Sequence, residues 1–209
     1  MMKKRLAYIS VVLLTGLSFN LSANLMLNGS FEDNIVGNWD VFSDIDGWDT
    51  SSGSGIEIQT NSTLGFIDAQ DGNNYVELDS HNNSTMFQQI DGLIAGLTYD
   101  VSFWYSARTN NGGNDNGINM LWGQDALSLD EIVSIDDATR TGSWIQNIFS
   151  LTATDATMYL AFEADGLNNS YGGLIDNIEL VASVPEPSVI ALLGAGLFGL
   201  GFARRRAKR

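Results

Sequence analysis

The chain of 209 residues contains no cysteine, only two prolines and a single histidine. Without cysteine it has no disulfide, no thiolate nucleophile and no soft metal ligand, so its stability must come from core packing or from a bound hard cation. It also lacks the Gly-x-Ser-x-Gly and His-Glu-x-x-His patterns of two large hydrolase classes. His81 lies in an asparagine-rich stretch that predicts a solvated turn. These absences favour a protein that is not an enzyme. A hydrolase that uses two carboxylates remains the catalytic alternative.

Basic residues are almost absent from the middle of the chain. Between residues 24 and 183 there are two of them, Arg108 and Arg140, against 24 acidic residues, which gives this segment a formal charge of −22. So acidic a surface repels nucleic-acid phosphates and anionic lipids, which excludes nucleic acid as a partner. It favours divalent cations and saline surroundings, although acidity that only keeps an exported protein soluble accounts equally well for most of these carboxylates.

Residues 1–23 have the pattern of a secretory signal peptide. A basic stretch at residues 3–5 precedes an apolar run from Leu6 to Leu21, and small residues follow it up to Ala23. We therefore expect export through the Sec translocon, cleavage after Ala23 and a mature chain that begins at Asn24. An uncleaved N-terminal anchor is the alternative.

Residues 184–209 combine a short motif, an apolar run and a basic end. Pro-Glu-Pro leads into an uncharged run from Val189 to Ala203, which is about 15 residues long and so at the short limit for a transmembrane helix. The basic cluster after it resists translocation, so the tail should stay cytoplasmic while the preceding segments lie outside. The arrangement resembles the PEP-CTERM sorting signal of bacterial exported proteins, and the residues that carry the resemblance are Pro185, Glu186, Pro187, Arg204, Arg205 and Arg206.

That resemblance implies an address at the cell envelope. It implies that an exosortase-type membrane protease recognises the motif, removes the helix and passes the protein to the cell surface or its polysaccharide matrix. Until then the precursor would be anchored in the inner membrane. An ordinary single-pass anchor is the alternative.

Residues 24–183 form one domain whose pattern is all-β. Short alternating segments are separated by clusters of Gly, Asn, Asp and Ser, which predicts a two-sheet antiparallel sandwich. In one segment Tyr99, Val101, Phe103 and Tyr105 alternate with polar residues and should face the core. The last segment predicts a bulge or a doubly buried stretch. We expect strands at residues 25–27, 56–59, 74–78, 85–90, 99–107, 118–122, 144–151, 157–162 and 173–181.

A series of short motifs runs along this domain. In chain order they are Asn28-Gly-Ser-Phe-Glu32, Gly47-Trp48, Gly72 to Asp79, Tyr99 to Arg108, Trp144 and Gly172 to Leu180. The series resembles the galactose-binding-like jelly-roll domains of bacterial extracellular proteins and of several carbohydrate-binding modules. The resemblance implies a jelly-roll sandwich. It implies no single ligand, because such domains bind sugars, lipids or proteins.

The same resemblance implies a structural Ca²⁺ between the opening turn and the closing strand. The corresponding residues are Asn28 and Glu32 in the turn and Asp176 in the strand, and calcium requires six to eight oxygen ligands, which carboxylates and carbonyls supply. The alternative is that Glu32 caps a turn and Asp176 is a solvated residue at a strand end.

Aromatic residues that the core does not need are candidates for sugar stacking. Trp48 and Trp144 should fill the sandwich. Trp104 points away from the core row of its strand, Arg108 has donors for sugar hydroxyls, and Trp39, Trp122 and Tyr171 adjoin loops rich in Gly and Asn. The resulting hypothesis is an exported, non-catalytic surface or matrix protein associated with the exopolysaccharide or biofilm of a Gram-negative bacterium. A carbohydrate-binding module that recognises an extracellular glycan is the first alternative, and an unrecognised extracellular hydrolase is the second.

Overall fold

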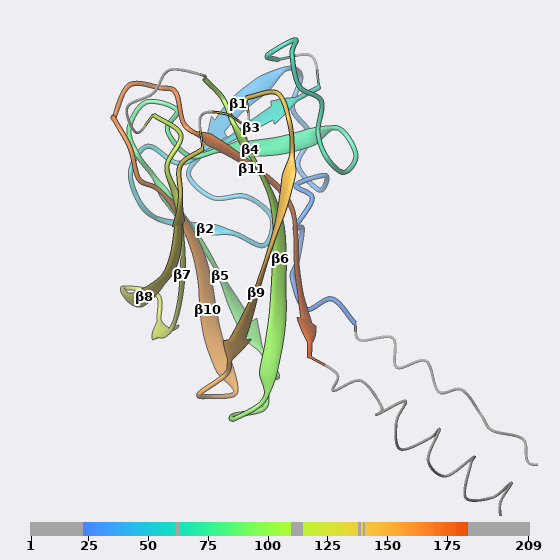
Figure 1. Ribbon diagram of the computed structural model, residues 1–209, viewed down its shortest axis with the longest axis vertical. Helices are drawn as coiled ribbons and strands as arrows, with labels where there is room; N and C mark the ends of the chain where they lie inside the picture. The colour runs from blue at the N-terminus through green and yellow to red at the C-terminus, as the bar shows by residue number, and fades with distance from the viewer. Residues whose placement is uncertain (1–22, 62, 110–114, 138, 140, 184–209) are drawn as a thin grey trace, which may run out of the picture.

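The protein folds as two antiparallel β-sheets packed face to face (Figure 1). The computed structural model describes residues 23–61, 63–109, 115–137, 139 and 141–183. The six-stranded sheet has the order β1 (Trp39–Phe42), β3 (Ile56–Thr60), β4 (Asn74–Glu77), β11 (Gly173–Ala182), β6 (Thr98–Ala107) and β9 (Ile145–Thr152). The five-stranded sheet has the order β2 (Asp49–Ser52), β5 (Thr85–Asp91), β10 (Thr157–Ala164), β7 (Ile118–Asp125) and β8 (Ser128–Ile135).

The predicted all-β, antiparallel architecture is confirmed, with two differences in the strands. The segment at residues 25–27 is not a strand, although the Leu25 N–H donates to the Leu180 carbonyl at 2.8 Å. Strands β1, β2 and β8 were not expected. All three are largely exposed, and β2 has no apolar residue, so no alternation marks it. Their pairing with β3, β5 and β7 makes them strands, and that pairing depends on the backbone rather than on side-chain pattern.

The main core lies between the two sheets. Tyr99, Val101, Phe103 and Tyr105 of β6 are all buried, as their alternation predicts. The Phe103 ring lies 4.9 Å from that of Phe162 on β10, in an edge-on geometry that joins the two sheets. Trp48 is also fully buried in this core, as expected.

A second, smaller cluster covers part of the outer face of the six-stranded sheet. Tyr75 and Leu174 point outward from β4 and β11, and Ile67 from the loop between β3 and β4 packs on them. Trp144 joins this cluster rather than the main core, with its Nε1 donating to the Asp68 carbonyl at 2.7 Å. The loop between β3 and β4 therefore folds back over its own sheet.

The closing strand β11 contains the irregularity that its sequence predicts. The register with β6 shifts between Asp176 and Glu179, and Asn177 has a φ of 46°. Asp176 precedes the shift and points to the outer face like Leu174, where its side chain lies under the same covering loop. The predicted signal peptide and membrane helix lie outside the described residues, and within the described part of the chain no helix is long and apolar enough to span a bilayer.

The first and last residues of the described domain lie near each other, at the same end of the central strands β6 and β11. The Ser183 N–H donates to the Thr98 carbonyl at 2.9 Å, at the start of β6, close to where Leu25 pairs with Leu180. Arg108 follows directly after the other end of β6. The ten residues of β6 span about 30 Å at about 3.3 Å per residue, so the two regions are at opposite ends of the sheet.

Candidate functional site

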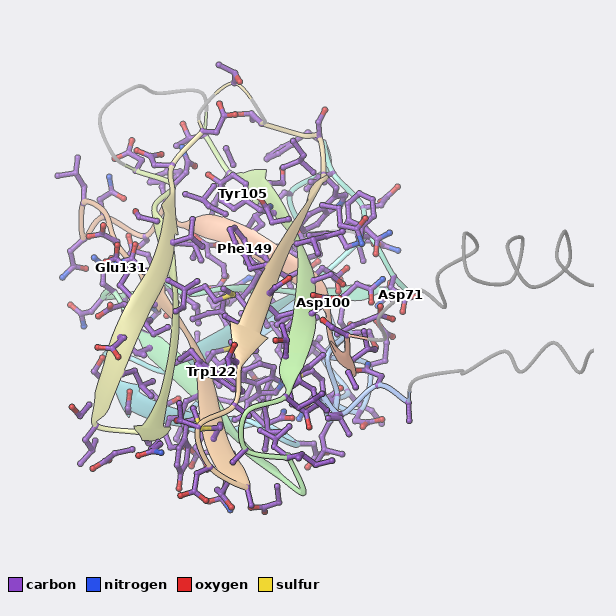
Figure 2. All side chains as sticks on the ribbon, turned by 60° about the horizontal axis from the view of Figure 1, so that its bottom comes forward. Asp71, Asp100, Tyr105, Trp122, Glu131 and Phe149 are labelled. Carbon is purple, nitrogen blue, oxygen red and sulfur yellow. The ribbon has the colours of Figure 1, made fainter. Side chains whose placement is uncertain are left out.

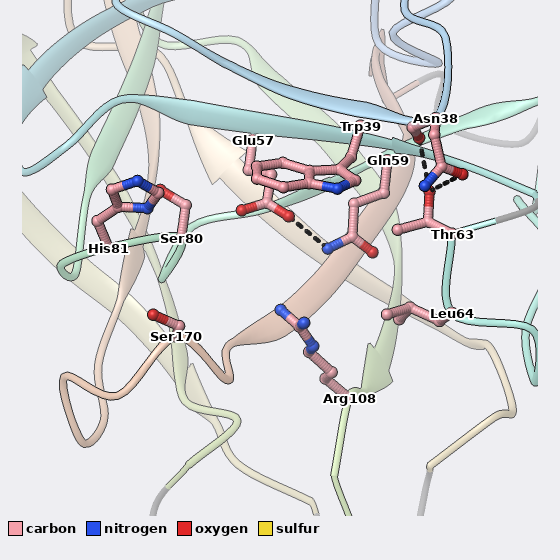
Figure 3. A pocket seen from close by; sticks show the side chains of 10 residues that line it. All are labelled: Asn38, Trp39, Glu57, Gln59, Thr63, Leu64, Ser80, His81, Arg108 and Ser170. Carbon is pink, nitrogen blue, oxygen red and sulfur yellow. Dashed lines mark hydrogen bonds between the residues drawn. The ribbon is translucent and has the colours of Figure 1, made fainter.

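A cavity of about 340 Å³ opens on the outer face of the six-stranded sheet, over β3 and β4 (Figure 3). We call it the polar groove. The residues that give it its chemistry are Trp39, Glu57, Gln59, Ser80, His81 and Arg108.

The floor of the groove is a network of buried polar side chains. On β3, Ile56 and Ile58 point into the core, so Glu57 and Gln59 point outward. On β4, Glu77 lies opposite Glu57. Gln59 Nε2 donates to Glu57 Oε1 and to Glu77 Oε2, each at 2.6 Å. Gln59 and Glu77 are fully buried, and Glu57 is 6% exposed. Burying polar groups costs free energy unless they are paired. A domain that binds no ligand would therefore gain no stability from placing several such groups together under a cavity.

Arg108 neutralises one of the two carboxylates. Its Nη1 forms an ion pair with Glu77 Oε2, and the Gly172 N–H donates to Glu77 Oε1 at 2.6 Å. Burial raises the pKa of Glu77 to about 7, although Arg108 and the Gly172 N–H oppose that rise. Burial also raises the pKa of Glu57, with the amide of Gln59 opposing it. Glu77 is therefore held as part of the network, whereas Glu57 faces the groove.

Two exposed aromatic rings border this polar floor. Trp39 on β1 is 49% exposed and extends over Glu57 and Gln59 (Figure 3). Tyr171 is 50% exposed, and the guanidinium of Arg108 lies 5.1 Å from the centre of its ring. Open aromatic faces beside a few converging hydrogen-bonding groups are suited to sugar rings, whose faces are apolar and whose edges carry hydroxyls.

The side chains predicted from the sequence to contact a glycan do not all lie together in the structure. Arg108 and Tyr171 lie together beside the groove. Trp104 is half-buried on the same outer face, but on β6, with β11 between it and β4. Trp122 belongs to the main core and is 6% exposed, and it lines a separate cavity of about 410 Å³ beside Gly123 and Gln124 on the other sheet (Figure 2 labels it).

Sequence reasoning did not find Glu57, Gln59 or Glu77. The signal was available in the alternation Ile56-Glu57-Ile58-Gln59, which places polar groups on the outer face of a strand whose other face is core. Nothing in the sequence indicated that this outer face is largely covered. That follows from the covering loop and from Arg108, which reaches Glu77 from β6.

The predicted calcium ligands lie around one loop. Asp176 is fully buried, and its Oδ2 accepts hydrogen bonds from the N–H groups of Gln70 and Asp71 at 2.7 and 3.0 Å. Glu32 Oε1 accepts from the N–H groups of Asn73 and Asn74 at 2.7 and 2.6 Å. Asp176 is therefore not a solvated strand-end residue.

The carboxylate oxygens of Glu32 and Asp176 face backbone N–H groups, and Asp176 is the more deeply buried of the two. Burial raises the pKa of Asp176 to about 7, opposed by three backbone N–H groups and reinforced by Asp71. A cation would remove that penalty. The described residues hold no group of three or more acidic, histidine or cysteine side chains suited to a metal, so carbonyl and amide oxygens would have to complete the shell. Asn28 instead closes its own turn: its Oδ1 accepts from the Asp33 N–H at 3.1 Å, and its Nδ2 donates to Asn34 and to the Asp46 carbonyl.

Curated relatives match this chain over only a small part of their own length. The multifunctional-autoprocessing repeats-in-toxin protein of Vibrio vulnificus is 27% identical over 156 residues, which cover 74% of this chain and 3% of the toxin. Halomucin of Haloquadratum walsbyi is 26% identical over 192 residues, which cover 83% of this chain and 2% of halomucin.

Solved structures share the fold at low identity. The K2 cleaved adhesin domain of Lys-gingipain has a TM-score of 0.51 and 18% identity, over 74% of this chain and 97% of that domain. TmCBM61, solved in complex with β-1,4-galactotriose, has a TM-score of 0.50 and 17% identity, over 78% of this chain and 100% of that one.

Two sequence families match the chain directly. The PEP-CTERM protein-sorting motif matches residues 183–206, which confirms the resemblance of the C-terminal segment and marks the chain as an exported protein. A family described as a carbohydrate binding domain matches residues 23–170. Because that match covers well over half of the sequence and the fold agrees with it, the chain belongs to the carbohydrate-binding domain family.

Proposed function

We propose that this protein is an exported, non-catalytic glycan-binding protein and that the polar groove is its binding site. After sorting by its C-terminal motif, it acts at the cell surface or in the extracellular polysaccharide matrix. Of the two non-catalytic functions considered from the sequence, the carbohydrate-binding module is thus favoured over a purely structural matrix component.

The observation that carries this proposal is the combination of buried polar groups and open aromatic rings in one cavity. Glu57, Gln59 and Arg108 offer acceptors and donors for sugar hydroxyls, and Trp39 and Tyr171 offer ring faces. A domain that served only as a structural matrix component would gain nothing from burying such groups at a cavity.

The position of the groove suits a protein that is delivered through its C-terminus. The groove lies beyond the Arg108 end of β6, whereas the chain leaves the described domain at Ser183, beside the Thr98 end. A precursor held by its C-terminal segment would therefore present the groove away from the membrane. Glycan binding and anchoring are thus compatible in a single molecule.

Hydrolysis is disfavoured by the same network. A two-carboxylate hydrolase needs space for a sugar bond, and often a water, between its carboxyl groups. Here Gln59 Nε2 bonds to both Glu57 and Glu77, and Arg108 and Gly172 occupy the remaining positions on Glu77. Glu77 is thus not free to act as a general acid or a nucleophile.

A glycan array probed with the fragment Asn24 to Ser183 tests the proposal, because this fragment contains all described strands and both clusters of the core. We expect retention by at least one extracellular polysaccharide class, and loss of that retention on Trp39→Ala. Absence of binding to every glycan, with the fragment shown to be folded by circular dichroism, would contradict it.

We further propose that Ca²⁺ binds between Glu32 and Asp176 as a structural ion. It would neutralise the buried Asp176 and hold the loop Gln70 to Asn74 in place over the outer face of the sheet. The ion would act on the fold and not on the sugar directly.

A further inference from the structure

We propose that the polar groove selects glycans that carry a free amino group, such as 2-amino-2-deoxyhexose residues, over neutral sugars and against uronic acids. This inference rests on the proposed glycan-binding function and names the class of sugar that the groove prefers.

The first support is the unpaired carboxylate of Glu57. Of the two carboxylates in the network under the groove, Glu77 has Arg108, the Gly172 N–H and Gln59 as partners. Within the described chain, the hydrogen bond that Glu57 receives comes from Gln59 Nε2, which is neutral. With Glu57 only 6% exposed, this leaves a nearly buried carboxylate that lines a cavity and forms no ion pair within the described chain, although Arg108 and His81 both favour its charged form from a distance. A charge in that position is stabilised when a ligand brings the opposite charge.

The second support is that two buried oxygen atoms at the groove receive no hydrogen bond. Gln59 Oε1 is buried and receives no hydrogen bond from any described residue, and the same holds for the Ser80 hydroxyl oxygen. An ammonium group donates up to three hydrogen bonds and accepts none, so it matches these acceptors better than a hydroxyl does.

The third support is the sign of the surrounding charge. The groove is lined by the carboxylate of Glu57 and by Arg108 and His81, with the Glu77 carboxylate paired to Arg108 beneath it, and residues 24–183 as a whole carry two basic against 24 acidic residues. The resulting negative potential attracts a cationic sugar and repels a uronate. Arg108 is the natural partner for a uronate carboxylate, but Glu77 already occupies it.

A sugar amine fits the groove better than a bare metal ion does. The cavity of about 340 Å³ is far larger than an ion requires, and it is bordered by the open rings of Trp39 and Tyr171. An ammonium group on a pyranose ring would use both features, since its charge would lie at Glu57 while the ring face packs on an aromatic side chain.

The test is calorimetric titration of the full chain with four tetrasaccharides, at low salt and below neutral pH, where the sugar amine is protonated. The four are β-1,4-linked glucosamine, the same tetramer with N-acetylated amines, cellotetraose and a galacturonic acid tetramer. We expect the glucosamine tetramer to bind at least about tenfold more tightly than the two neutral ones, and the galacturonic acid tetramer not to bind.

Two variants separate a local effect from the overall charge. Glu57→Gln keeps a side chain of the same size and removes the charge, so it should abolish the preference for the amine over the N-acetylated form. Glu131→Gln removes one exposed charge from β8, on the other sheet, and should leave that preference intact.

The possible results separate the preference for amino sugars from glycan binding itself. Equal affinity for the amine and neutral tetramers, or tighter binding of the uronate, overturns the amino-sugar inference while glycan binding itself stands. A preference that survives in Glu57→Gln also overturns it. Failure of all four tetramers and of the glycan array to bind overturns the proposed function as well.

Discussion

Glu32 and Asp176, which lie near the two ends of the domain sequence, hold the two ends of one loop. Asp176 accepts the N–H groups of Gln70 and Asp71, and Glu32 accepts those of Asn73 and Asn74. Between these pairs lies Gly72, with a φ of 76°. The opening turn and the closing strand therefore both anchor the loop that covers the outer face of the sheet.

We expect calcium to raise the melting temperature of the domain, because a cation between these carboxylates would offset the burial of Asp176. The measurement is thermal unfolding in calcium and then in excess chelator. Identical midpoints would contradict the structural ion.

Gly72→Ala should abolish the calcium response. A Cβ at this position would lie 2.6 Å from the Glu32 carboxyl carbon, so Glu32 would have to move away from the loop. Gly65→Ala is the matched control: its φ of 71° imposes a similar backbone strain, but nothing lies within 4 Å of the added carbon. Calcium should therefore still raise the melting temperature of Gly65→Ala. An equal response in the two variants would show that Glu32 is not a ligand.

Without calcium, the domain should lose stability as the pH rises from the ordinary carboxyl range to about 7. Burial raises the pKa of Asp176 from 3.8 to about 7 in the folded state, so the unfolded chain releases this proton at lower pH. Ionisation therefore favours unfolding across that window. Denaturant midpoints in chelator, compared between the parent chain and Asp176→Asn, should show a shallower pH slope for the variant. Parallel slopes would indicate that Asp176 does not titrate there.

Arg108→Ala should destabilise the protein by about 3 kcal/mol above neutral pH, because it leaves Glu77 buried without its ion-pair partner. The loss should be smaller at acidic pH, where Glu77, with a pKa of about 7, takes up a proton. Urea unfolding on both sides of that value measures the difference. A loss that does not depend on pH would argue that Arg108 acts through packing on Tyr171 instead.

Trp39→Ala should reduce glycan binding by at least about fivefold, since removing one stacked ring costs about 1 kcal/mol or more. Trp104→Ala should have little effect, because Trp104 lies on β6 with β11 between it and β4. Affinity electrophoresis in a gel that contains the retained polysaccharide compares the two variants directly. The reverse result would place the site at Trp104, where sequence reasoning alone put it.

The strand pattern shows how far local information reaches. The segment at residues 99–105 alternates so regularly that its core face was correctly predicted, whereas β2, with the sequence Asp-Thr-Ser-Ser, has no apolar residue to mark it. The placement of Trp122 was not predicted, because adjacency to a loop in sequence does not determine which face of a strand is buried. Arg108 and Tyr171 were both named from sequence, but nothing local indicated that they would lie together or that Glu77 would be their neighbour.

The sequence by itself determines those features of the protein that depend on composition and on short-range order. The sorting motif, the strong negative charge and the all-β pattern belong to this class, because each can be recognised within a few residues or by counting. The polar groove and the candidate ion site were decided only by the tertiary structure. Trp39, Glu57, Glu77, Arg108 and Tyr171 come from separate strands and loops, and the strand order β1-β3-β4-β11-β6 is what brings them to one face. That order results from pairing between strands distant in sequence, which no local pattern specifies.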